Sequence, residues 1–249
     1  MIVAQHGKDA PQVSPHGLDA LVVRFGSRMS EPANRAALAF RASLDREGWP
    51  GVEETASALT SVFVRFDPRS VSHAEMTRRL DDHIARTEWT TADLGAERRL
   101  WRIPTVYGGA HGPQLEDAAR LVGVSAEAAI RELSSTPVRV LAIGFAPGQP
   151  YLGELPGHWA IPRQSGLTPE VPEGALTTAI CQFVLFANPS PTGWRHIGQT
   201  AFRCFRPEAE DPFPLRPGDE ALFEAVPPDA LDRIRRDDPR GGGAASERL

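Results

Sequence analysis

The chain has 249 residues, of which 41% are hydrophobic and 24% are charged, so it is long enough to bury a core without disulfide or metal staples. Its formal net charge is −5 and no stretch gathers Lys and Arg into a basic face, which argues against nucleic acid as a partner. The first residues lack a signal-peptide pattern and no apolar run reaches the length of a membrane span, so we expect a cytoplasmic protein without a membrane partner.

Strands and helices alternate in the first part of the chain. Residues 1–16 are polar and contain prolines, and they predict a flexible arm. Helices are expected after Ser30 and after Ser72, because an apolar stripe at helical spacing follows each serine. The expected strands cover residues 18–25, 52–56, 59–66 and 98–106. This order of strand, helix, strand, strand, helix and strand is typical of a ferredoxin-like α+β domain, which we place at residues 17–100.

The pattern changes after residue 100. Short helices are expected near Pro113 and after Ser125, and from Val138 onward short apolar runs alternate with loops rich in proline and glycine. That alternation is typical of a β-barrel, which we expect over residues 101–228. Residues 229–249 are charged and then glycine-rich, and they predict a disordered tail.

The stretch VLAIGFAPGQPYLG, residues 140–153, is the first candidate for a ligand site. An apolar run breaks there into a loop in which glycines let the main chain approach a ligand and prolines restrict φ. Phe145 and Tyr151 can form the apolar walls of a pocket. The alternative is a tight connection at the rim of a β-structure.

Further segments carry candidate binding residues. In WAIPRQ, Arg163 can bind a carboxylate or phosphate through its planar guanidinium, or it can bond the carbonyls of its own loop. In PTGWRHIG, Trp194 is expected as a core or rim aromatic rather than as a platform for a cofactor. The segment PGDE, residues 217–220, is expected to form a turn before the final strand.

Several kinds of site have no signal in the sequence. The seven histidines form no HxH or HExxH motif, and Cys181 and Cys204 form neither a metal motif nor a disulfide framework, so no metal site is expected. The GxSxG motif of serine hydrolases is absent. The P-loop motif is absent too, so ATP, if it is used, is held by an unconventional cradle or by a partner.

The segments YGGAHGPQLEDAARLVGVSAEAAI, GFAPGQPYLG, IPR and GWRHIGQT together resemble the family of the B-type subunit of 5-oxoprolinase. That family also contains proteins described as allophanate hydrolase subunit 1 and as Kip-type inhibitors of a sporulation histidine kinase. The resemblance extends from LDALVVRFG to RPGDEALFEAV. It implies an N-terminal ferredoxin-like domain and a C-terminal cyclophilin-like β-barrel domain, with no implication of prolyl isomerase activity.

The resemblance also implies a function. The chain is expected to be a subunit of an ATP-dependent amide-bond (lactam) hydrolase of the 5-oxoprolinase type, inactive without a homologous second barrel subunit, the C type. A third subunit, the A type, and a small carboxylate or amide ligand are implied as further partners. The alternatives are a regulatory binding protein of the histidine-kinase-inhibitor type and a diverged subunit that acts on another cyclic amide or urea derivative.

By position, residues of the family's motifs correspond to a set that is expected to bind substrate. The set consists of Gly144, Phe145, Pro147, Gly148, Tyr151, Arg163 and Trp194. Arg163 is expected to bind the acidic group of the substrate, and the backbone amides of residues 144–148 are expected to stabilise an oxyanion; no catalytic side chain is assigned. The chain departs from the family pattern at Ala110, Gln149, Glu170 and Thr192. Among these, Glu170 reverses a charge that would attract a carboxylate.

Overall fold

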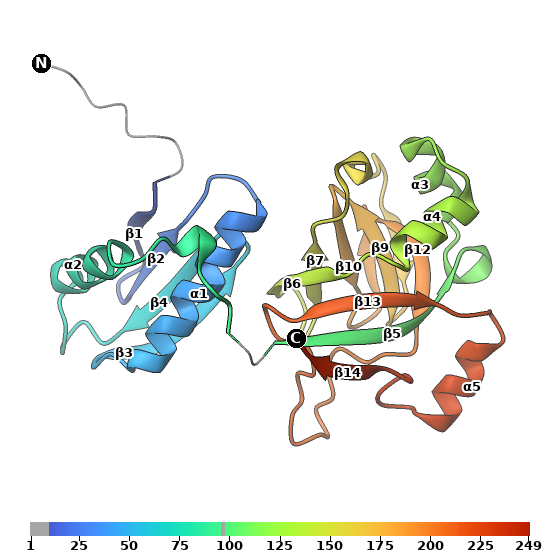
Figure 1. Ribbon diagram of the computed structural model, residues 1–249. Helices are drawn as coiled ribbons and strands as arrows, with labels where there is room; N and C mark the ends of the chain where they lie inside the picture. Colours follow the sequence, from blue (N-terminus) through green and yellow to red (C-terminus); the bar gives the residue numbers. More distant parts are fainter. Residues whose placement is uncertain (1–9, 96–97) are drawn as a thin grey trace, which may run out of the picture. The chain divides into compact units, whose positions relative to one another are not determined.

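The computed structural model describes residues 10–95 and 98–249, which form two compact units that divide between residues 96 and 97 (Figure 1). Each unit has a hydrophobic cluster of its own. The division lies before the expected boundary at residue 100, because the last strand expected for the first domain belongs to the second unit. Among the described residues, no helix combines the length and the apolar character that crossing a membrane requires.

The first unit is an antiparallel sheet packed against helices. Its strand order is β1, β2, β4 and β3, with the bounds Gln12–His16, Ala20–Arg24, Ser61–Phe66 and Val52–Ala58. Helices α1 (Glu31–Glu47) and α2 (His73–Ile84) and the 3-10 turn η1 (Trp89–Thr91) share one cluster with β4. Alternation along β4 directs Val62, Val64 and Phe66 into that cluster, where each is 0% exposed.

Both helices begin at the expected serines. The hydroxyl of Ser30 accepts a hydrogen bond from the N–H of Ala33, and the hydroxyl of Ser72 accepts one from the N–H of Glu75. Helix α1 ends at Gly48, whose φ of 57° is a left-handed conformation that glycine adopts without strain. Local capping chemistry therefore decides where both helices begin.

The structure differs from two expectations for the first unit. Of the expected arm, residues 1–9 lie outside the described residues, but Gln12–His16 form strand β1, which pairs antiparallel with β2. Its polar residues and its proline are tolerated because β1 lies at the edge of the sheet. The ferredoxin-like order is not found in residues 10–95, where the elements run β1, β2, α1, β3, β4, α2, η1. The strand expected at residues 98–106 is β5 (Arg99–Tyr107) of the second unit.

The second unit is built on a closed barrel of seven strands, β12-β9-β10-β7-β6-β13-β5, in which β5 pairs with β12 to complete the ring (Figure 1). Besides β5, the bounds are β6 Val138–Ile143, β7 Pro150–Gly153, β9 Ala175–Ala179, β10 Gln182–Leu185, β12 Arg195–Thr200 and β13 Glu220–Ala225. Ile103, Leu176 and Phe183 belong to the core and are 0% exposed. Helices α3 (Leu115–Val122) and α4 (Ala126–Leu133) pack against the same core, and the expected β-barrel is confirmed.

The segment expected to be a disordered tail, residues 229–249, instead forms secondary structure. Helix α5 (Ala230–Asp237) buries Ala230 and Leu231, and strand β14 (Ala245–Arg248) pairs antiparallel with the first half of β5. Strand β5 therefore has β13 along one edge, and β14 followed by β12 along the other.

The glycine run before β14 has the composition of a flexible tail, but it forms a turn that packs closely against another segment of main chain. A Cβ atom at Gly242 would lie 2.3 Å from the backbone of Ala201 and Phe202, so no larger residue fits there. The carboxylate of Asp238 accepts hydrogen bonds from the N–H groups of Gly241 and Gly243 at 2.8 and 2.9 Å. Composition alone could not reveal this, because the contact that requires glycine comes from a distant part of the chain.

The PGDE segment forms the expected turn and also holds the start of the barrel. The carboxylate of Asp219, on a residue that is 3% exposed, accepts hydrogen bonds from the N–H and guanidinium of Arg99, the indole N–H of Trp101 and the N–H of Arg216. One buried carboxylate thus joins the loop before β13 to β5.

Replacing Asp219 should destabilise the second unit strongly. Asp219→Ala leaves buried donors without an acceptor, and we expect the free energy of unfolding to fall by about 3–5 kcal/mol. Asp211→Ala is the matched control, because Asp211 pairs with Arg216 at 3.1 Å but its side chain is 52% exposed, so it should cost less than about 1 kcal/mol. Urea denaturation of both variants checks this, and equal losses would contradict the role of Asp219.

A buried histidine connects the two helices of the first unit. His83 is 2% exposed, contacts the hydroxyl of Ser43 at 3.1 Å and packs against Phe40, Trp49 and Trp89. Burial lowers the pKa of His83 below its usual value; Glu47 opposes this shift and Arg86 adds to it. The folded protein therefore binds the proton of His83 less readily than the unfolded chain does.

This histidine should make the stability depend on pH. Because the pKa of His83 is lower in the folded state, its neutral form is stabilising above about pH 6.5, and that contribution is lost as the pH falls further, by up to about 1.4 kcal/mol per pH unit. We expect His83→Gln to reduce the difference in unfolding free energy between pH 7.5 and 5.5, while the exposed-strand control His16→Gln retains it. Burial also lowers the pKa of His196, so some dependence should remain. An unchanged difference in His83→Gln would refute this.

Candidate functional site

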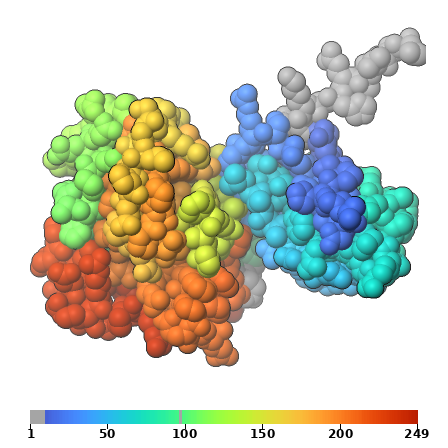
Figure 2. Space-filling view, turned by 180° about the vertical axis from the view of Figure 1, so that it is seen from behind, coloured from blue at the N-terminus to red at the C-terminus, as the bar shows by residue number. Residues whose placement is uncertain are grey.

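A pocket of about 350 Å³ opens on the second unit, outside the barrel core. Its lining comes from the loop before β7, from β7 itself, from the segment between β7 and β8 (Thr168–Val171), from β10 and from the end of β11 (Ser190–Thr192). The lining residues are Phe145, Gln149, Tyr151, Arg163, Gln164, Leu167, Val184, Phe186, Pro191, Thr192, Gly193 and Trp194. Figure 2 shows the segment between β7 and β8 (yellow) at the surface of this unit, beside the segment of α3 (green).

The pocket exists because barrel strands are buried on both faces. Along β9, Leu176 belongs to the barrel core, whereas Ala175 and Ala179, which point to the opposite face, belong to a separate apolar cluster. That outer cluster also holds Val184, Phe186, Val171 and Trp194, with Tyr151 packed against it. Val171 of β8, in the small sheet of β8 and β11, belongs to this outer cluster, and Val184, Phe186 and Trp194 of the same cluster line the pocket.

Two aromatic side chains and one arginine of the lining contact one another in series. The rings of Tyr151 and Trp194 meet edge to face at 6.3 Å, and the guanidinium of the exposed Arg163 lies 5.3 Å from the centre of the Trp194 ring. Cation–π contact of this kind holds a guanidinium in place without neutralising it. Arg163 is the one charged residue in the lining, and within residues 10–95 and 98–249 it has no carboxylate partner. The pocket therefore favours an anion.

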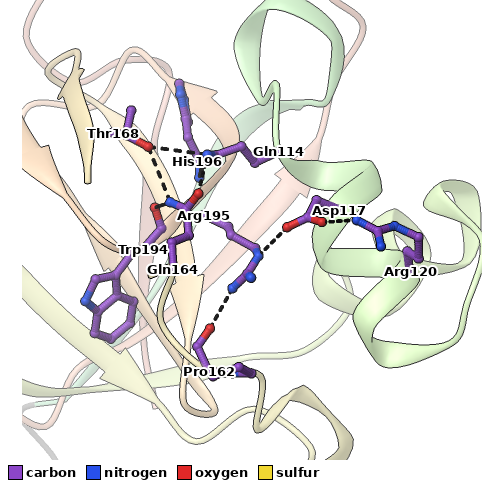
Figure 3. A network of polar contacts seen from close by, with 9 residues as sticks. All are labelled: Gln114, Asp117, Arg120, Pro162, Gln164, Thr168, Trp194, Arg195 and His196. Carbon is purple, nitrogen blue, oxygen red and sulfur yellow. Dashed lines mark hydrogen bonds and ion pairs between the residues drawn. The ribbon is translucent and has the colours of Figure 1, made fainter. Parts of the chain in front are cut away.

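Gln164, which follows Arg163, is fixed by a network of amides (Figure 3). Its Oε1 accepts a hydrogen bond of 2.7 Å from the side chain of Gln114, and its Nε2 donates to the carbonyl of Trp194 at 3.1 Å. Its backbone N–H donates to the carbonyl of Gly193 at 2.8 Å. Gln164 therefore links the segment of Arg163 to the segment of Trp194 through hydrogen bonds.

A half-buried ion pair supports the same segment (Figure 3). Arg195, whose side chain is 9% exposed, donates to Asp117 of α3 at 2.6 Å and to the carbonyl of Pro162 at 2.6 Å. The hydrogen bond from Arg195 lowers the pKa of Asp117, and Arg120 also contributes. Because Pro162 directly precedes Arg163, this ion pair positions the binding arginine from outside the pocket.

The candidate loop contributes less backbone to the pocket than expected. Of the predicted set, Phe145, Tyr151, Arg163 and Trp194 line the pocket together, whereas Gly144, Pro147 and Gly148 do not. Gly148 packs against the main chain of Cys204, where a Cβ atom would lie 2.3 Å from the carbonyl oxygen. The N–H of Gly144 donates to the carbonyl of Gln149, so this amide is already engaged within the loop and is not free for the expected oxyanion role.

The departures from the family pattern fall into two groups. Gln149 and Thr192 line the pocket, and they are 1% and 5% exposed. Ala110 and Glu170 are exposed and are absent from the lining, so the reversed charge at Glu170 does not face the pocket.

Sequence reasoning assigned no role to Val184, which also lines the pocket. Val184 and Phe186 alternate with residues of the barrel core, and the signal for them is that β9 and β10 are apolar or uncharged at consecutive positions. Such strands have a second layer over their outer face. His196 follows Trp194 closely in sequence, but it is buried outside the lining and bonded through its backbone to Gln114, and burial lowers its pKa. In the described part of the chain, no three His, Cys, Asp or Glu side chains are grouped so that they could hold a metal ion.

Comparisons with known proteins agree with this architecture. Residues 11–215 match the family described as the carboxyltransferase domain, subdomain C and D. The B-type subunit of 5-oxoprolinase from Bacillus subtilis is 32% identical over 225 residues, which are 86% of this chain and 92% of that protein.

Solved structures show the same fold. The crystal structure of TTHA0988 aligns with a TM-score of 0.71 and 32% identity over 84% of this chain, which spans only 40% of that longer chain. The urea amidolyase of Kluyveromyces lactis aligns over 100% of this chain and 17% of its own, with a TM-score of 0.77 and 15% identity, and so shares the fold alone. From the matched residues and the Bacillus relative, the chain belongs to the carboxyltransferase-domain family, among the proteins named as the B-type subunit of 5-oxoprolinase.

Proposed function

We propose that this chain is the substrate-binding subunit of an ATP-dependent lactam hydrolase of the 5-oxoprolinase type. The observation that carries the proposal is the unpaired guanidinium of Arg163 over Trp194 at a pocket with no other charge among its lining residues. A guanidinium in this position matches the carboxylate of a small acid such as 5-oxoproline. Tyr151, Phe186 and Trp194 offer apolar faces to its ring.

The composition of the lining favours a chain that binds substrate rather than one that performs the chemistry alone. Among the lining residues there is no Ser, Cys, His, Asp, Glu or Lys, and the hydroxyl of Thr192 already accepts a hydrogen bond from the N–H of Trp194. The hydroxyls of Tyr151 and Thr192 need a base before they can react at neutral pH, and the lining supplies none, so the general base is supplied from elsewhere. In this proposal it comes from a homologous second barrel subunit.

The rim of the pocket has the character of a surface that such a partner covers. Phe145 and Leu167 both line the pocket and are 75% and 71% exposed. Phe145 also has a φ of 73°, an unfavourable angle for a bulky residue. In the proposed complex, ATP is bound by the third subunit, since this sequence has no P-loop motif.

The proposed activity can be measured directly. With the neighbouring subunits present, 5-oxoproline should stimulate ADP release, and Arg163→Ala should raise the KM for 5-oxoproline about tenfold because the carboxylate loses a charged hydrogen-bond donor. Arg163→Lys should restore part of the affinity. The control is Arg131→Ala, at an exposed arginine outside the pocket lining. Absence of 5-oxoproline-dependent ADP release with every combination of subunits would sink the proposal.

The ion pair behind the pocket gives a second test. Asp117→Ala removes the carboxylate that holds Arg195, and we expect a higher KM, a nearly unchanged kcat and a loss of about 2 kcal/mol in unfolding free energy. Asp117→Glu should recover part of the KM, because a longer carboxylate still reaches the guanidinium. Steady-state kinetics of both variants with the complete set of subunits decides the matter. A fall in kcat with KM unchanged would argue against a positioning role.

A further inference from the structure

Gln149 is a buried amide in the wall of the pocket. It is 1% exposed and lines the pocket together with Arg163. Its backbone is fixed within the loop, because its N–H donates to the carbonyl of Ala146 and its carbonyl accepts from the N–H of Gly144. The preceding Gly148 packs closely against the main chain of Cys204, so the backbone that carries the Gln149 side chain is fixed in position.

The orientation of the Gln149 amide follows from its neighbour. The N–H of Ala187 points at the side chain of Gln149 at 3.5 Å and needs an acceptor, so the oxygen Oε1 faces Ala187. The amino group Nε2 then points away from Ala187. Over residues 10–95 and 98–249, this Nε2 has no hydrogen-bond partner, whereas each side-chain polar atom of Gln164 has one.

Among the described residues, Nε2 is not one of the buried side-chain atoms that lack a partner, so this unpaired donor opens into the pocket although the residue as a whole is 1% exposed. A ligand that covers Nε2 without accepting its hydrogen bond pays the cost of removing it from water. Gln149 thus adds a neutral donor to the pocket that also holds the cationic donor of Arg163, and most of the other lining residues are apolar. A ligand that satisfies both presents an uncharged carbonyl oxygen to Gln149 and a carboxylate to Arg163, with a compact apolar ring between them.

We propose that Gln149 determines specificity by donating a hydrogen bond from Nε2 to the ring carbonyl of a small cyclic carboxylic acid. The inference rests on the proposed function of the pocket and names the chemical class of its ligand: a ring that carries both a carbonyl and a carboxylate. A ring acid without the carbonyl covers the Nε2 donor without pairing it and therefore binds more weakly.

Two probes of equal size isolate this hydrogen bond. The anions 3-oxocyclopentanecarboxylate and cyclopentanecarboxylate differ only at the ring carbonyl, and 5-oxoproline serves as the reference ligand. Dissociation constants are measured by calorimetry for the full chain, alone and with its partner subunit. We expect the native protein to prefer the oxo acid about tenfold. Gln149→Met, which keeps the length of the side chain but not the donor, should bind both probes equally.

The controls separate this inference from the proposed function. Gln182→Met changes a glutamine that is 6% exposed and outside the pocket lining, and it should keep the tenfold preference. Because the readout is a ratio of two affinities in one variant, loss of folded protein does not imitate the result. If Gln149→Met binds 5-oxoproline and still prefers the oxo acid to cyclopentanecarboxylate about tenfold, the role of Gln149 is overturned and the proposed function stands. No binding of any probe, with or without the partner, overturns both.

Discussion

Strands of the barrel that are buried on both faces are the constraint on which the second unit depends. The inner side chains of β9 and β10 complete the barrel core, so their outer side chains require a cover of their own. The sheet of β8 and β11 and the loop before β7 contribute to that cover, and the pocket lies where these segments meet. The position of the site is a consequence of how the apolar layers close.

Covering a barrel with loops brings polar backbone groups into contact with apolar surface, and each must find a partner. Gln114, Gln164 and Arg195 serve this purpose by bonding carbonyls and amides of segments that are distant in sequence. The same bonds fix the place of Arg163 relative to Trp194. Stability and ligand geometry therefore depend on one set of side chains.

Local chemistry made much of the fold predictable from the sequence. The capping serines Ser30 and Ser72, the glycine after α1 and the strand alternation at Val62 and Val64 each act over a few residues. Predictions failed where the deciding contact was distant in sequence. Strand β5 was expected in the first domain but belongs to the barrel, and the glycines near Gly242 form a packed turn rather than a disordered tail. In the candidate site, Arg163 and Trp194 line one pocket as expected, whereas the place of Val184 in its wall depends on tertiary packing that no local pattern contains.

The pairing of β14 with β5 protects an edge. Without residues 245–249, the backbone groups of Arg99 to Arg102 that β14 now occupies would be exposed, while the other edge of β5 stayed paired with β13. An open row of N–H and C=O groups is a template for an incoming extended chain. Residues 245–248 occupy that row through main-chain pairing, and the ion pair of Glu247 with Arg102 at 3.3 Å adds to it, so an exposed segment closes the edge that strand addition would need.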